Sequence, residues 1–239
     1  MVVRGAEVVY LSPHPDDVAF SAAAHVAHDV AQGLGVQVLT LFRPGGGGPF
    51  GDTETRQQED ERFAARLGVE LHACDFPDAI VRHPRYQART ALFGPLPEDE
   101  EPLVESLRVR VQAAIDSCRP RCLRVLAPLA VGGHVDHEAT RRAALRLDLR
   151  GAELVFYEDA PYVLKGDHPP PHALDLLQPS VLVDERAVKL DAIACYASQW
   201  PLFFPRLEDW RHALATYANE LGFPEENVLA ERVWRAPEK

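Results

Sequence analysis

Short apolar segments alternate along the chain with longer segments in which apolar residues recur at helical spacing. Residues 7–12 form the first strand-like run, and the next segment places Val18, Ala22, Val26 and Val30 at intervals of four. That spacing puts the four side chains on one face of a helix. Further strand-like runs lie at residues 36–42, 69–74, 122–127 and 153–157. The alternation predicts an α/β fold with a mostly parallel sheet and helices on both faces.

Helices are expected between these runs and in the tail. Their predicted ranges are residues 17–32, 53–67, 103–117, 136–148, 186–197 and 207–221. Thr53 is the expected cap of the second helix, and Gly68 is its expected end. The two tail helices are expected to pack across an edge or a face of the sheet.

Two segments rich in proline and polar residues, 77–102 and 158–180, have no regular pattern. Both are long for simple connections between a strand and a helix. Each segment either walls a binding cleft or decorates the surface, and the pattern alone favours neither.

Composition narrows the class of protein. The chain has 239 residues, 46% of them apolar and 26% charged, as expected for one globular domain spanning residues 1–239. The net charge of −11 disfavours binding to nucleic acid or anionic lipid. No stretch approaches the roughly 18 apolar residues of a membrane span, and the first residues lack a signal-peptide layout. We therefore expect a cytoplasmic protein that acts on a small molecule, and a homo-oligomer stays open.

The four cysteines form no CxxC pair; they are Cys74, Cys118, Cys122 and Cys195. With no sign of export, reduced thiols are expected. Cys118 and Cys122 are interpreted as small apolar residues beside a helix-to-strand turn rather than as metal ligands.

The first candidate for chemistry is the segment PHPDD at residues 13–17, between the first strand and the first helix. Ligands of open α/β sheets bind outside the carboxyl ends of the strands, which is where this segment lies. Histidine nitrogen and aspartate oxygen both suit zinc or ferrous iron. A helix cap would explain one aspartate, but not His14 or a second acid in the same turn.

The second candidate is the segment GGHVDH at residues 132–137, which follows the fourth strand and opens another helix. In the usual strand order 3-2-1-4-5, the first and fourth strands are neighbours at the switch point of the sheet. The two segments are then expected to face each other across one crevice. Gly132 and Gly133 would let the backbone approach a ligand closely.

Three residues of these segments can supply a metal site, namely His14, Asp17 and His137. Three protein ligands leave zinc a fourth position for water, whose pKa falls to about 7 when it is bound. The same ligands accept ferrous iron. The sequence therefore predicts a site for Zn²⁺ or Fe²⁺.

The remaining polar residues of the segments can move protons. Asp16 can take the proton of the water as a general base. His134 can stabilise the oxyanion or protonate the leaving amine, and Asp136 can orient a histidine. This set suits hydrolysis of an amide or an ester, whereas a GxSxG elbow, a phosphate-binding loop and an HExxH motif are missing from the sequence.

The pair LSPHPDD and GGHVDH resembles the zinc-dependent de-N-acetylases of the LmbE/PIG-L group. Further matching stretches are TRQQEDERFAARLG, FPDAIVR, YEDAPYV and KLDAIACYASQ. The resemblance implies a Rossmann-like fold and N-deacetylation of an amino sugar such as N-acetylglucosamine, or of a related conjugate. It also implies the metal, base and histidine roles given above, and contacts of Arg56 and Asp78 with sugar hydroxyls.

The sequence departs from the family pattern at two positions. Val18 stands where a glutamate is usual, and Gly132 stands where some members carry a tyrosine. Tyr157 and Tyr162 are the candidates to replace that tyrosine. Two alternatives to the deacetylase also stay open: another metal-dependent amidase or esterase, and a non-catalytic protein that binds metal or sugar.

Overall fold

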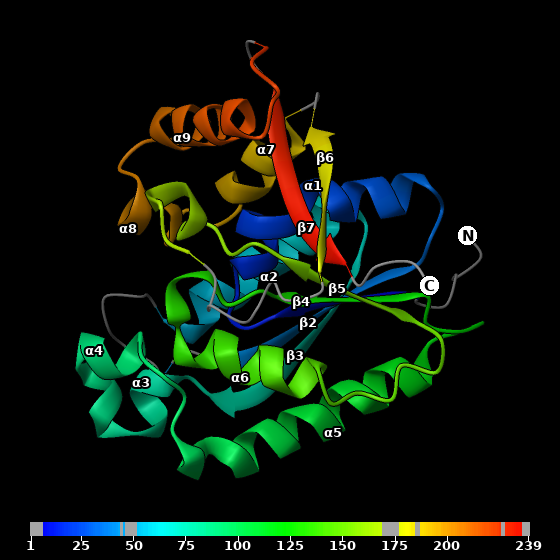
Figure 1. The fold of residues 1–239 in the computed structure, drawn as a ribbon, viewed down its shortest axis with the longest axis vertical. Helices are drawn as coiled ribbons and strands as arrows, with labels where there is room; N and C mark the ends of the chain where they lie inside the picture. The colour runs from blue at the N-terminus through cyan, green and yellow to red at the C-terminus, as the bar shows by residue number, and fades with distance from the viewer. Residues whose placement is uncertain are drawn as a thin grey trace.

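The computed structural model describes residues 7–43, 45, 52–168, 177–184, 187–225 and 228–235. These residues fold around one seven-stranded sheet with the order β3-β2-β1-β4-β5-β7-β6 (Figure 1). The strands are β1 (Val8–Ser12), β2 (Val36–Arg43), β3 (Glu70–Pro77), β4 (Arg124–Pro128), β5 (Glu153–Tyr157), β6 (Gln178–Asp184) and β7 (Leu229–Arg235). Strands β1 to β5 are parallel, and β7 pairs antiparallel with both β5 and β6.

Helices connect the strands as the sequence pattern predicts. The longer ones are α1 (Asp17–Ala31), α2 (Thr53–Leu67), α5 (Glu101–Ser117), α6 (Val135–Ala144), α7 (Val188–Ala194) and α9 (Leu207–Glu220). The predicted order 3-2-1-4-5 of the first five strands is confirmed, and so is the Rossmann-like α/β class with helices on both faces.

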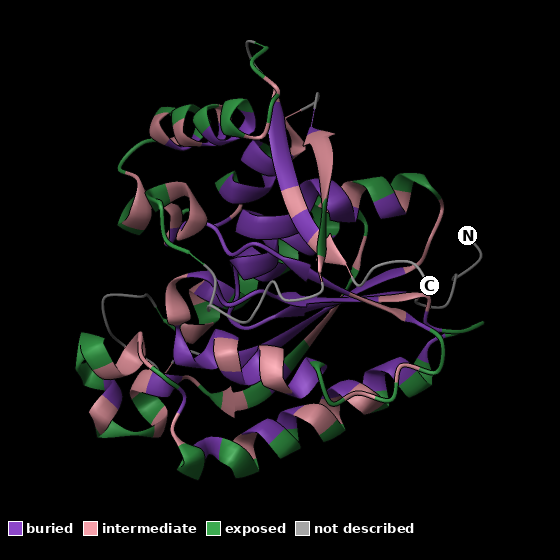
Figure 2. Ribbon diagram, in the orientation of Figure 1, coloured by how far each residue is buried: buried purple, intermediate pink, exposed green. Residues whose placement is uncertain are grey.

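Each face of the sheet has its own apolar core, because successive residues of a strand point to opposite faces. Val9 and Leu11 of β1 pack with α5 and α6, whereas Val8 and Tyr10 pack with α1, α7 and α9. Figure 2 shows the central strands buried between these two helical layers. The site therefore rests on strands that are held from both sides.

Some predicted boundaries need correction. Asp52, not Thr53, caps α2: its carboxylate accepts the backbone N–H of Thr55 at 2.8 Å. Gly68 ends that helix in the left-handed conformation, as expected. Helix α6 ends at Ala144 rather than near 148, and strands β6 and β7 were not predicted.

The segment 77–102 forms four short helical elements, which are α3 (Ala79–Arg82), η1 (Pro84–Gln87), α4 (Arg89–Leu92) and η2 (Glu98–Glu100). Residues 158–168 contain η4 (Val163–Lys165), whereas residues 169–176 of the second long segment lie outside the described residues. A further short helix, α8 (Trp200–Phe203), precedes α9. Within the described part of the chain, no helix is long and apolar enough to cross a membrane.

Helix α1 is interrupted near its start. Ala22 has non-helical backbone angles, and Glu231 of β7 accepts the backbone N–H groups of Ala24 and His25 at 3.0 and 3.1 Å. A carboxylate on the amino end of a helix satisfies N–H groups that the break leaves unpaired. The part of α1 that follows the break is thereby fixed against the strand β7.

Candidate metal and catalytic site

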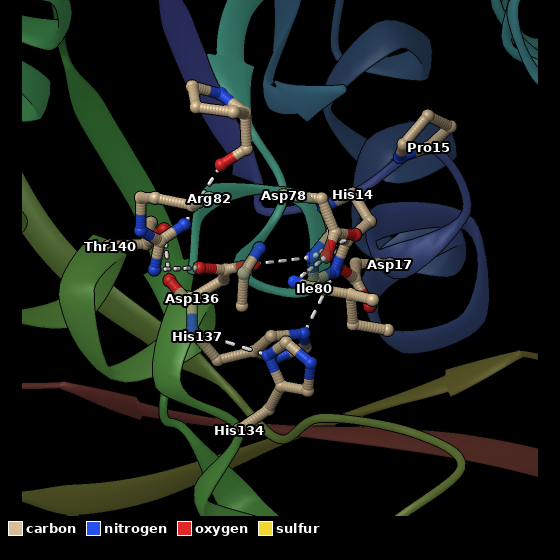
Figure 3. A network of polar contacts seen from close by, with 12 residues as sticks. His14, Pro15, Asp17, Asp78, Ile80, Arg82, His134, Asp136, His137 and Thr140 are labelled. Carbon is tan, nitrogen blue, oxygen red and sulfur yellow. Dashed lines mark hydrogen bonds and ion pairs between the residues drawn. The ribbon is translucent and has the colours of Figure 1, made fainter. Parts of the chain in front are cut away.

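The candidate site lies at the carboxyl ends of three parallel strands. His14 follows β1, His134 precedes α6 after β4, and Asp159 follows β5. The ring nitrogen Nε2 of His14 lies 3.1 Å from a carboxylate oxygen of Asp136. The expected convergence of the two sequence segments is therefore confirmed, and Figure 3 shows their side chains pointing toward one another.

Asp17 lies close to both of the other predicted ligands, His14 and His137. Oδ2 of Asp17 lies 3.2 Å from Nδ1 of His14 and 3.3 Å from Nε2 of His137. Tetrahedral ligands with bonds of about 2.0 Å lie about 3.3 Å apart. Among the described residues, none hydrogen-bonds to Nε2 of His137 although this atom is buried. A buried nitrogen lone pair beside a carboxylate fits a metal ion.

Two further groups of donor atoms lie within 4.8 Å of one another in the described part of the chain: His14 with His134 and His137, and His14 with Asp78 and Asp136. Asp136 is the weaker ligand candidate because its oxygens already bond to the backbone N–H of Ala79 and to Arg82, both at 2.9 Å. The two groups place His134 and Asp78 at the edge of the same cluster.

Carboxylates hold both ligand histidines in position. Nδ1 of His137 lies 2.6 Å from Asp159, whose other oxygen accepts the backbone N–H of Val131 at 2.8 Å. Nε2 of His14 faces Asp136. If each of these nitrogens carries the proton, Nε2 of His137 and Nδ1 of His14 keep the lone pairs that a metal needs.

Asp136 is itself held by a chain of charged and polar groups. Arg82 donates to Asp136 at 2.9 Å and to Glu100 at 2.9 Å, and the hydroxyl of Tyr86 donates to Glu100 at 2.6 Å. Figure 3 shows Arg82 beside Asp136, on the side away from His137. This chain anchors the segment 77–102 to the site, so part of that segment walls the site rather than decorating the surface.

Asp16 lies at the start of α1 in a strained conformation, with φ at +108°. A non-glycine residue at positive φ persists only where its surroundings hold it. Nη2 of Arg56 lies 3.1 Å from the Asp16 carboxylate, and the guanidinium also donates to the carbonyl of Pro15. Arg56, expected at a substrate, is therefore buried against Asp16.

Burial and neighbouring charges shift the pKa values of the residues in the site. Burial raises the pKa of Asp16 to about 8, although the Arg56 guanidinium opposes this. Burial also lowers the pKa of His134 well below its usual value, and the nearby His14 adds to that effect. Burial would lower the pKa of His137, but the carboxylates of Asp17 and Asp159 raise it to about 9. The arrangement thus separates a proton acceptor from a neutral imidazole.

Asp159 and Arg82 were not among the predicted site residues. Asp159 had a usable signal, since it follows β5 just as His14 follows β1. Arg82 had none, because its partner Asp136 is 54 residues away in the sequence. Asp78 lies 3.5 Å from Nε2 of His14, and its side chain is 14% exposed.

A doubly wound α/β sheet with a histidine–aspartate cluster at its switch point defines a class of ligand-binding or catalytic α/β proteins. The family comparison identifies the class more closely. Residues 9–147 match the PIG-L family, described as GlcNAc-PI de-N-acetylase. The chain belongs to this family of deacetylases, as its two motifs predict.

Two curated relatives carry the same description, 2'-N-acetylparomamine deacetylase. The protein from Niallia circulans is 30% identical over 187 residues, which cover 64% of this chain and 66% of the relative. The protein from Streptomyces fradiae is 33% identical over 182 residues, which cover 69% of this chain and 61% of the relative. The chain thus spans just under two thirds of the length of these relatives.

A solved structure of similar fold covers nearly the whole chain. It is the antimicrobial reagent A40926 pseudoaglycone deacetylase Dbv21, with a TM-score of 0.74 and 26% sequence identity. The match covers 98% of this chain and 99% of that one. The similarity therefore extends beyond residue 147, where the family match ends, to the antiparallel edge of the sheet.

Proposed function

We propose that this chain, as one domain, is a metal-dependent hydrolase that removes the N-acetyl group from an amino sugar or a sugar conjugate. The observation that carries the proposal is the buried Nε2 of His137, which has no hydrogen bond among the described residues and faces Asp17. Relatives named as deacetylases of an acetylated aminoglycoside support the substrate class.

His14, Asp17 and His137 would hold the metal, for which we propose zinc; ferrous iron suits the same ligands. When bound, the ion supplies a Lewis acid that polarises water and the acyl carbonyl. Asp159 and Asp136 keep the rings of His137 and His14 oriented. Each carboxylate lies within hydrogen-bond distance of the ring nitrogen that does not face Asp17.

Asp16 would accept a proton from the attacking water. Burial raises the pKa of Asp16, which makes the ionised carboxylate a stronger proton acceptor than an ordinary aspartate, and Arg56 favours the ionised form and orients it. His134 lies beside both ligand histidines, with its ring 5.0 Å from His14 and 5.2 Å from His137. A neutral imidazole there would donate a hydrogen bond to the oxyanion.

Asp78 would bind hydroxyl groups of the sugar. Its carboxylate caps α3 by accepting the N–H of Ile80 at 3.0 Å, and its side chain keeps 14% exposure. The partly exposed carboxylate keeps acceptor sites for which a sugar hydroxyl is a suitable donor. Arg56, by contrast, would act through Asp16 rather than by direct contact with the sugar.

The test is the variant Asp16→Asn, assayed by acetate release from acetylated amino sugars, including 2'-N-acetylparomamine. Loss of the general base should lower turnover about 10²- to 10⁴-fold, while zinc content measured on the purified protein stays near one ion per chain. Wild-type turnover in this variant would exclude Asp16 as the base. A wild-type protein that binds zinc but releases acetate from no substrate would favour another amidase or esterase, or a binding protein.

A further inference from the structure

We propose that the rings of Phe93 and Tyr162 form a wall that limits the size of the acyl group at the site, and that Gly132 makes room for this wall. Here the aromatic wall means the two rings Phe93 and Tyr162. The inference rests on the proposed deacetylase function, because it assigns a specificity determinant to that site.

The two rings pack against His134, which caps α6, and against His137 within α6. Phe93 meets His134 edge to face at 5.3 Å between ring centroids, and Tyr162 meets His137 in the same manner at 5.9 Å. The two aromatic rings also contact each other at 5.9 Å. Since His134 and His137 are themselves 5.2 Å apart, the four rings form one continuous cluster.

Gly132 leaves the space that the Tyr162 ring occupies. A Cβ atom at Gly132 would lie 2.8 Å from Cγ, 2.9 Å from Cδ1 and 3.0 Å from Cβ of Tyr162. These contacts are shorter than two carbon atoms tolerate. Gly133 also has positive φ, but a Cβ there would meet only the carbonyl oxygen of Phe93, at 3.8 Å. The absence of a side chain at position 132 therefore makes room for Tyr162. We had expected it to let a ligand approach the backbone closely.

The backbone on both sides keeps Tyr162 against the site. The N–H of Ala160 donates to Oγ of Ser21 at 3.1 Å, and the N–H of Val163 donates to the carbonyl of Asp159 at 3.1 Å. Because Asp159 is bonded to His137, this segment moves only if the ligand histidine moves too. Tyr157, the other candidate tyrosine, is fully buried and donates its hydroxyl to the carbonyl of Leu11 at 2.7 Å.

The chemistry of the wall favours the acyl chain over the sugar. Sugar hydroxyls need polar partners, and Asp78 offers one at His14. Two aromatic rings instead suit a methyl group, and under this proposal they exclude a longer chain. Arg89 stacks over Phe93, with its guanidinium carbon 4.9 Å from the ring centroid, and so holds the outer ring in place.

The experiment measures acyl preference in two ways, using zinc-loaded protein throughout. Calorimetry gives the affinities for acetate and butanoate, and hydrolysis of N-acetyl- and N-butanoylglucosamine gives the ratio of kcat/KM values. We expect wild type to prefer the acetyl forms, and Tyr162→Ala to reduce the preference about tenfold or more, the effect of one methylene in a tight pocket. Tyr162→Phe, which keeps the ring, should retain the wild-type preference.

A size swap then tests the glycine. Gly132→Ala should weaken acetate binding by pushing the ring into the site, and adding Tyr162→Ala should restore that binding. In the matched control Gly133→Ala, which has the same unfavourable φ without the collision, adding Tyr162→Ala should restore nothing. Circular dichroism and zinc content identify any variant that fails to fold.

Three outcomes would overturn the proposal: an unchanged preference in folded Tyr162→Ala, equal loss in Tyr162→Phe, or no rescue of Gly132→Ala. If wild type prefers acetate over butanoate but hydrolyses no N-acetyl substrate, the proposed deacetylase function fails while the aromatic wall stands. If the deacetylase is active and Tyr162→Ala leaves both ratios unchanged, only the wall fails.

Discussion

Two buried clusters pair a histidine with a carboxylate, one around His25 of α1 and one at the candidate site, and they differ in how well the histidine is hydrogen-bonded. Nδ1 of His25 lies 2.8 Å from Glu231, and the same carboxylate lies 3.4 Å from Nζ of Lys189. In the other cluster, Nε2 of His137 is buried without a hydrogen bond from any described residue. A buried polar group usually has a partner, so the missing bond supports the proposed role of His137 as a ligand, whereas His25 has its partner within the fold.

Charge separates the two clusters as well. Glu231 has a buried cation beside it in Lys189, and it also contacts His25 and two backbone N–H groups. At the site, Arg56 lies beside Asp16, but Asp17 and Asp159 have salt bridges only to histidines among the described residues. Carboxylates that crowd together repel one another unless a cation lies among them. The first cluster stabilises the fold, and the second would gain stability from a metal ion.

The variant His137→Ala would give the largest effect at the site. We expect it to lose tight zinc binding and to fall to background deacetylase activity, because Asp17 and His14 alone do not complete the ligand set. Metal analysis of the purified variant and acetate release would check this. His25→Ala is the matched control: it removes another buried histidine and should keep its zinc. Full zinc occupancy in His137→Ala would contradict the proposed difference between the two histidine clusters.

The variant Glu231→Gln would give the largest effect on folding. It leaves the charge of Lys189 buried and unpaired, so we expect the free energy of unfolding to fall by about 3–5 kcal/mol. Urea denaturation would measure the loss. Glu59→Gln is the control, since Glu59 is buried with bonds to the N–H and hydroxyl of Ser198 but has no buried cation beside it. Equal losses in the two variants would argue against the role of Lys189.

The ion pair of Glu231 and Lys189 should also make the stability of the protein depend on pH. Burial alone would raise the pKa of Glu231, but Lys189 and His25 lower it below its usual value. A carboxyl group whose pKa is depressed on folding contributes stability above its unfolded pKa and loses it as pH falls through the folded pKa. The stability difference between wild type and Glu231→Gln should therefore shrink below about pH 4.3, the ordinary value for glutamate. A difference that stays constant down to pH 3 would contradict this.

The variant Asp159→Asn would give the smallest of these effects. It weakens the hold on the ring of His137 without removing a proposed ligand, and we expect zinc affinity to fall about 10- to 100-fold. Competition with a chelator would measure the change. Asp29→Asn is the control, because Asp29 is equally buried but bonds to Tyr10 and Arg124. Affinity unchanged in Asp159→Asn would show that the histidine needs no carboxylate behind it.

The parallel part of the fold could be predicted because its residues follow simple periods. Strands buried on both faces read as apolar runs, and the helices between them repeat every three to four residues. Strand β7 broke this rule, since Glu231 is a charged residue that is 1% exposed inside a strand. Strand β6 broke it differently, because most of its residues are only partly buried. Neither sequence pattern can be distinguished from that of a loop.

The motifs of the site could be predicted, but not all of its supporting residues. His14 and His137 stand in short segments at strand ends, where the type of residue and the place in the fold agree. The partnership of Gly132 with Tyr162 joins positions 30 residues apart, and a glycine in a sequence does not say which neighbour needs its space. Such pairs depend on how loops pack, which local patterns do not encode.

The bond between Glu231 and the break in α1 has a consequence for the order of folding. The two ends of this contact are about 207 residues apart, and closing so long a loop is slow compared with local helix formation. During synthesis, the segments with the candidate ligands emerge well before the strand that secures α1. The site should therefore reach its final geometry only when β7 inserts between β5 and β6, so a ribosome-bound chain that lacks β7 would hold the ligand residues without a fixed α1.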